Sequence, residues 1–146
     1  MYLQKTSHLT NETLNRKWSH IDAKDMTLGR LATQVAMILR GKTKPSFSNH
    51  LDVGDFVVVT NCRHVKMTGN KWNDKFYYHH SNHIGGIKSA SAKEQFKKDP
   101  CSLLYIAVKG MLPKTSLGRS QLTKLKLFAD ATHQHTAQQP VTITIN

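Results

Sequence analysis

The feature that most constrains the fold is an uninterrupted β-branched and apolar run, DFVVVTN, at residues 55–61. Polar and apolar residues do not alternate along it, so the run predicts a strand that is covered on both faces. Such strands belong to parallel sheets, in which neighbouring strands are joined by a crossover connection that is usually a helix. The chain before residue 55 should therefore hold a strand followed by a helix.

Both elements are predicted in that region. Residues 18–23 form a short β-prone run, and from Leu28 to Leu39 the apolar residues recur with helical spacing. Thr27 is a candidate N-cap for this helix, and Gly41 is a candidate C-terminal stop. Together these segments predict a strand–helix–strand unit with a right-handed crossover.

The rest of the chain continues the alternation of helices and strands. The expected elements are a strand at 75–80, a helix from the capping-box residue Ser91 to just before Pro100, a buried helix at 103–111 ended by Pro113, an amphipathic helix at 117–129 and a candidate edge strand at 141–145. This order predicts an α/β fold, a single three-layer α/β/α domain with a small, mainly parallel sheet of about four strands. The expected divisions are an N-terminal arm (1–17), a basic α/β domain (18–130) and a C-terminal tail (131–146).

The charge balance indicates the kind of partner. Lys and Arg number 21 against 9 Asp and Glu, so the 146-residue chain carries a net charge of +12. Self-repulsion of this size destabilises a compact state unless a polyanion, most commonly nucleic acid, neutralises it. An anionic membrane would need a basic amphipathic helix or an apolar anchor, and no run approaches bilayer length. Residues 1–8 lack the apolar core of an export signal, and Cys62 and Cys101 have no CxxC spacing, so we expect a cytoplasmic protein with reduced thiols.

The basic residues are distributed in a way that favours RNA. Residues 26–51 and 100–129 contain many Lys and Arg but no acid. Surface helices usually mix both signs to form ion pairs, so the cations in these stretches should have another partner. Irregular folded RNA suits such loops and arms better than DNA, because no DNA-binding motif is recognisable. Asp52 and Asp55, on either side of Gly54, are interpreted as turn-capping carboxylates.

Two histidine groups and a Gly-Gly pair are the strongest alternatives to a purely RNA-binding function. Residues 79–83 (HHSNH) precede Gly85 and Gly86, and His133 and His135 lie near the C-terminus. The histidine spacing does not match a metal site, and no carboxylate lies within the first group. The Gly-Gly pair lacks the spacing of nucleotide-binding loops, and no G-x-S-x-G motif is present. We therefore expect no metal and no cofactor, and interpret the imidazoles as groups that hydrogen-bond phosphates or stack on bases.

Several segments resemble one known family. The strongest block contains Val108-Lys109-Gly110-Met111-Leu112-Pro113, Gly118-Arg119 and Leu125-Lys126-Leu127-Phe128. The others, in the same order as in the family, are Thr27-Leu28-Gly29-Arg30-Leu31-Ala32, Thr68-Gly69-Asn70-Lys71, Tyr77-Tyr78-His79-His80, His83-Ile84-Gly85-Gly86-Ile87-Lys88 and Ala137-Gln138-Gln139-Pro140. Over about residues 16–140 the chain is similar to the bacterial-type large-subunit ribosomal protein thirteen family. It departs from the family signature at Asp130, where the family has glycine, a preferred residue if this position is a left-handed helix cap.

The resemblance implies a non-catalytic structural constituent of the large ribosomal subunit. Its partners would be large-subunit ribosomal RNA and neighbouring ribosomal proteins, and it would contribute early in subunit assembly. The candidate RNA-binding residues are Arg30, Arg40, Lys42, Lys44, Lys71, Tyr78, His79, His80, His83, Gly85, Gly86, Lys88, Lys109, Lys114, Arg119 and Lys126. Two alternatives stay open at this point: an RNA- or nucleotide-dependent enzyme that uses residues 79–86, and a free RNA chaperone.

Overall fold

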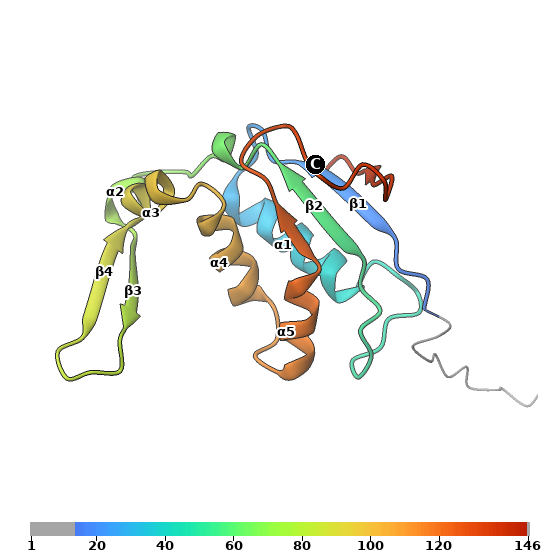
Figure 1. The fold of residues 1–146 in the computed structure, drawn as a ribbon, viewed down its shortest axis with the longest axis horizontal. Coiled ribbons are helices and arrows are strands. Elements are labelled where there is room, and N and C mark those ends of the chain that lie inside the picture. The colour runs from blue at the N-terminus through green and yellow to red at the C-terminus, as the bar shows by residue number, and fades with distance from the viewer. Residues whose placement is uncertain (1–13, 146) are drawn as a thin grey trace, which may run out of the picture.

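The computed structural model describes residues 14–145 and contains the four-stranded parallel sheet that the sequence predicts. Its strands are β1 (Trp18–Asp22), β2 (Phe56–Thr60), β5 (Leu125–Leu127) and β6 (Val141–Thr142). Their spatial order is β5-β2-β1-β6, and each neighbouring pair is parallel. Helices cover one face of the sheet (Figure 1). The α/β fold class is therefore confirmed.

Helix α1 (Leu28–Arg40) makes the crossover between β1 and β2. Its apolar stripe is buried in the same cluster as Val57 and Val59, whereas Val58 points to the opposite face because side chains alternate along a strand. Gly41 ends the helix with a φ of 81°. Thr27 occupies the N-cap position, but its side chain makes no capping bond. The amide of Leu28 instead donates to the Lys66 carbonyl at 2.9 Å, so tertiary structure caps this helix end.

Helix α4 (Ser102–Met111) packs against α1 through Leu103, Leu104 and Val108. The prediction of a buried helix is correct for this face alone: Tyr105, expected on the polar side, is exposed, and so are the apolar residues Ile106 and Met111. The helix lies at the margin of the helical layer: α1 packs on its inward face, and α3 (Ala92–Lys98) contacts it from the hairpin side. Its far side faces the hairpin described below (Figure 1).

The predicted helix at 117–129 is also wrong in its second half. Helix α5 (Ser116–Thr123) stops at Lys124, and the following residues form β5 at the edge of the sheet. The Lys124 carbonyl accepts a hydrogen bond from the Val57 amide at 3.1 Å, which begins the pairing with β2. Leu125 and Leu127 alternate with Lys126, a strand period that the helical spacing of the preceding leucines obscures. Lys126 therefore lies on a strand, and it shares no helix face with Arg119.

The second face of the sheet is covered by the chain after β5. Trp18 and Phe56 stack on this face with ring centroids 4.4 Å apart. The ring of His135 lies 5.1 Å from Trp18, and that of His133 lies 5.5 Å from His20. The C-terminal segment thus forms the third layer and brings β6 alongside β1. Asp130, at the start of this segment, is not left-handed and forms an exposed ion pair with Arg63 at 3.1 Å.

A second, two-stranded antiparallel sheet projects away from the main body (Figure 1). It is the hairpin of β3 (Phe76–His80) and β4 (Ile87–Ser91), flanked by the short helices α2 (Lys71–Asp74) and α3 (Ala92–Lys98). The predicted capping box of Ser91 and Glu94 is confirmed at the start of α3. Trp72 and Phe96 meet edge to face at 5.0 Å and join α2 to α3 at the hairpin base. A 3-10 turn, η1 (Cys62–His64), follows β2 and leads toward this region.

Candidate nucleic-acid interface

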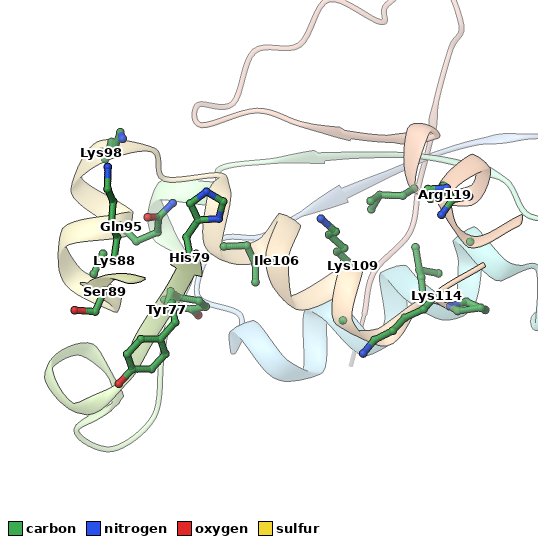
Figure 2. A pocket seen from close by; sticks show the side chains of 17 residues that line it. Tyr77, His79, Lys88, Ser89, Gln95, Lys98, Ile106, Lys109, Lys114 and Arg119 are labelled. Carbon is green, nitrogen blue, oxygen red and sulfur yellow. The ribbon is translucent and has the colours of Figure 1, made fainter. Parts of the chain in front are cut away.

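A groove of about 910 Å³ lies between the hairpin and the α4–α5 corner. The hairpin and α3 supply one wall, and α4, α5 and their connection supply the other. Figure 2 shows Lys88 and Lys98 on one side and Lys109, Lys114 and Arg119 on the other. The lining residues, all in the described part of the chain, include five Lys and Arg and no acid. This arrangement concentrates positive potential in a concave surface, which is the electrostatic form of an anion-binding site.

The α4–α5 connection places three of these cations at one corner. Lys109 lies in the last turn of α4, and Pro113 prevents that helix from continuing. Thr115 then caps α5, because its side chain accepts a hydrogen bond from the Gly118 amide at 3.3 Å. A side chain at position 118 would collide with the Pro113 carbonyl, so glycine allows the tight turn. Arg119 consequently lies in the first turn of α5 and lines the groove.

The hairpin contributes aromatic and basic groups to the opposite wall. His79 and Lys88 are paired in the antiparallel register, and Tyr78 is paired with Ser89. Tyr78 exposes 69% of its surface, which is unusual for a large aromatic side chain without a partner. Lys75 lies over the ring of Tyr77 at 5.4 Å. An exposed ring beside cations offers both stacking and phosphate contact, the two interactions that bind RNA strands.

Three of the histidines, His80, His133 and His135, serve the local structure. The Nδ1 atom of His80 accepts a hydrogen bond from the Asn82 amide at 3.0 Å, so the neutral ring carries its proton on Nε2. His133 and His135 pack against the sheet, well separated in sequence and structure from the hairpin. Among the residues that the structure describes, no three or more His, Cys, Asp or Glu side chains gather as metal ligands would.

Two lysines in the acid-free stretches have acidic partners after all. Lys44 pairs with Asp55 at 2.5 Å, and Lys124 pairs with Asp52 at 2.6 Å. The inference that all cations in those stretches need an external partner is therefore wrong, because folding brings acids from residues 52–55 to them. Asp52 and Asp55 are ion-pair partners rather than simple turn caps. Lys44 consequently has a structural role, and its side chain is only 19% exposed.

The groove gathers six of the sixteen candidate RNA-binding residues: Tyr78, His79, Lys88, Lys109, Lys114 and Arg119. Three others, His83, Gly85 and Gly86, lie at the hairpin tip with His80 at the end of β3. The candidates that do not line the groove include Arg30, Arg40, Lys42, Lys71 and Lys126. Lys98 also lines the groove but was not among the predicted RNA-binding residues. Its position in the basic last turn of α3 could have indicated such a role.

This fold and this groove define the class of small basic α/β proteins built to bind a polyanion. The sequence model described as ribosomal protein L13 matches residues 16–134. The chain belongs to the ribosomal protein L13 family, which confirms the resemblance seen in the sequence.

Three relatives show how far the similarity extends, and each is named large ribosomal subunit protein uL13. The protein of Desulfotalea psychrophila is 52% identical over 90% of this chain and 93% of its own. The protein of Roseiflexus sp. is 54% identical over 95% of this chain and 92% of its own. The protein of Brevibacillus brevis is 55% identical over 87% of this chain and 88% of its own. The similarity therefore covers most of this chain and most of each relative.

Proposed function

We propose that this chain is a structural constituent of the large ribosomal subunit and binds ribosomal RNA through the groove between the hairpin and the α4–α5 corner. It is not an enzyme, and it works in the ribosome of the cytoplasm, beside neighbouring ribosomal proteins. The observation that carries the groove assignment is its lining of five cations without an acid. Family membership supplies the ribosomal context.

The geometry of the groove supports RNA over a small anion. Its cations lie on two walls that come from separate parts of the chain, so they suit several phosphates along a backbone better than one. Arg119 can bind two phosphate oxygens at once, whereas Lys109 and Lys114 act as point charges. Tyr78 adds an exposed ring for base stacking.

The alternative of a nucleotide-dependent enzyme loses its main support in the structure. The Gly86 amide donates to the His83 carbonyl at 2.9 Å, and the Gly86 carbonyl accepts from the Ser81 amide at 3.0 Å. Both bonds close the hairpin turn, and the Gly86 amide is therefore not free to donate to a phosphate. No helix in the described residues is long and apolar enough to cross a membrane.

The division of the chain into an arm (1–17), an RNA-binding domain (18–130) and a tail (131–146) is kept as part of this proposal. Residues 1–13 of the arm lie outside the described residues. The described end of the arm is hydrogen-bonded to the segment before β2. Arg16 donates to the Asp52 carbonyl at 3.2 Å, and the Lys17 amide donates to the Asp55 carboxylate at 2.7 Å. The tail supports the sheet through His133 and His135.

The test is a binding titration of the full chain against purified large-subunit ribosomal RNA at several salt concentrations. Each phosphate that the protein neutralises should add about 0.7–0.9 to the slope of log affinity against log salt. Several contacts from one groove should therefore give a slope of a few units. A slope near zero would contradict the proposal, as would failure of the chain to sediment with large-subunit particles.

A further inference from the structure

The exposed apolar side chain of Ile84 stands at the tip of the β3–β4 hairpin, and Ile87, where β4 begins, is 66% exposed. Ile84 is fully exposed, while the hairpin base is packed through α2 and α3. Figure 1 shows the hairpin extending away from the four-stranded sheet, so its tip is far from the body of the molecule. A single exposed isoleucine is common and means little by itself. Its meaning here depends on how the tip is built and on what surrounds it.

The turn that carries Ile84 is closed by hydrogen bonds. The Ser81 amide donates to the Gly86 carbonyl at 3.0 Å, the Gly86 amide donates to the His83 carbonyl at 2.9 Å, and the Asn82 amide donates to His80. Asn82 and Gly85 both have positive φ values, 65° and 72°. A Cβ atom at Gly86 would lie 2.1 Å from the Ser81 hydroxyl. The backbone is thus fixed on both sides of Ile84, which keeps this side chain pointing outward.

The electrostatics around the tip select the kind of partner. Between Asp74 and Glu94 the chain has no acid: three histidines and Lys88 lie in the half of the hairpin toward the tip, and Lys75 and Lys93 lie at its base. A surface with positive charges and no acid is typical of proteins that bind RNA, whereas an apolar contact with an average protein surface does not require it. The basic wall of the groove is built from the same two strands, so backbone binding in the groove brings the tip against the same RNA.

We propose that Ile84 is an apolar wedge that contacts the face of a base in the RNA, next to the backbone held by the groove. This inference rests on the proposed function and deepens it by assigning a base contact to the tip. Proteins that bind the minor groove of DNA insert Ile, Leu or Phe between base steps, which shows that an aliphatic side chain can pack on the face of a base. In folded RNA the accessible bases are the unpaired ones of loops and bulges, so the target is a base of that kind.

A wedge and a phosphate contact differ in their salt dependence. Ile84 releases no counterion, so its removal lowers affinity at every salt concentration and leaves the slope unchanged. For Ile84→Ser we expect a loss of affinity of about tenfold, the order expected when the burial of one isoleucine side chain is lost. The turn is unaffected, because the Ile84 side chain takes no part in its hydrogen bonds. Val141→Ser changes another exposed apolar side chain, 65% exposed and at the opposite edge of the four-stranded sheet, and should bind as the unmodified chain does.

The direct test places a photoreactive benzoylphenylalanine at position 84 of the full chain and irradiates it in complex with large-subunit ribosomal RNA and in assembled subunits. Cross-links to RNA, at a nucleotide whose chemical reactivity rises with Ile84→Ser, are expected. Cross-links to a ribosomal protein instead, or unchanged affinity of Ile84→Ser, would overturn the wedge. Such a failure would leave the groove proposal standing if the salt slope stays steep, so the two can be told apart.

Discussion

The ammonium of Lys124 lies 2.6 Å from a carboxylate oxygen of Asp52, a residue 72 positions earlier in the chain. The same ammonium donates to the carbonyls of Gly54 at 2.8 Å and Leu39 at 3.4 Å. Lys124 is only 5% exposed, and its three donors thus all have protein acceptors. One side chain therefore joins the end of α1, the approach to β2 and the start of β5, and so helps to position the α4–α5 corner.

Removal of the carboxylate should be strongly destabilising. Asp52→Ala leaves a buried ammonium without its counter-charge, which typically costs about 3–5 kcal/mol. Lys124→Met should cost clearly less, because it removes the buried charge and leaves Asp52 partly exposed to water. Denaturant unfolding of both variants measures the difference. Equal losses for the two variants would mean that the charge pair itself does not matter.

The same pair predicts a pH dependence. Burial lowers the pKa of Lys124 from its ordinary value of 10.5, and Asp52 opposes this shift. In Asp52→Asn the pKa of Lys124 should fall further, so that between this lowered pKa and pH 10.5 the unfolded chain holds a proton that the folded chain releases. Stability then rises with pH in that window. The deficit of Asp52→Asn in unfolding free energy should therefore shrink between pH 7 and pH 10, and a constant deficit would contradict this.

The basic corner should be required for RNA binding but not for folding. Replacement of Lys109, Lys114 and Arg119 by Ala should shift the stability by about ±0.5 kcal/mol per site, since all three are exposed. It should weaken RNA binding, lower the salt slope by about 2–3 and reduce incorporation into the large subunit.

A matched control separates position from charge. Lys24, Arg63 and Lys66 are also exposed and lie outside the groove. Their replacement by Ala removes an equal number of positive charges. Two of these side chains form exposed ion pairs, which contribute little stability. If both triple variants lose RNA affinity equally, net charge rather than the groove determines binding.

The two cysteines should differ in reactivity. Both are free, and the hydrogen bond between them raises the pKa of Cys62 and lowers that of Cys101. Iodoacetamide, which reacts with the thiolate, should modify Cys101 first, with a pH midpoint below the ordinary 9.0. Cys62 should react only after unfolding, because it is buried. In Cys62→Ala the midpoint for Cys101 should move upward, and an unchanged midpoint would show that the hydrogen bond has no effect.

Local patterns in the sequence were enough to predict the strand–helix–strand unit. The β-branched run of β2, the apolar spacing of α1, Gly41 and the capping box of Ser91 each act over a few residues, so a linear sequence displays them. Half of the predicted helix at 117–129 failed because the hydrogen bonds of β2 to the segment after Lys124 outweigh helical spacing. Strand β4 was missed because its exposed residues show little alternation.

The sequence by itself determined the fold class, the need for a polyanionic partner and the family, because composition, periodicity and motif order are properties of the linear chain. Only the tertiary structure decided which cations are available to that partner. Lys44 and Lys124 lie in acid-free stretches, yet folding brings Asp55 and Asp52 to them. Lys88 and Arg119, by contrast, come from distant segments to one acid-free groove. Charge pairing depends on distances of a few ångströms through space, and sequence separation does not encode them.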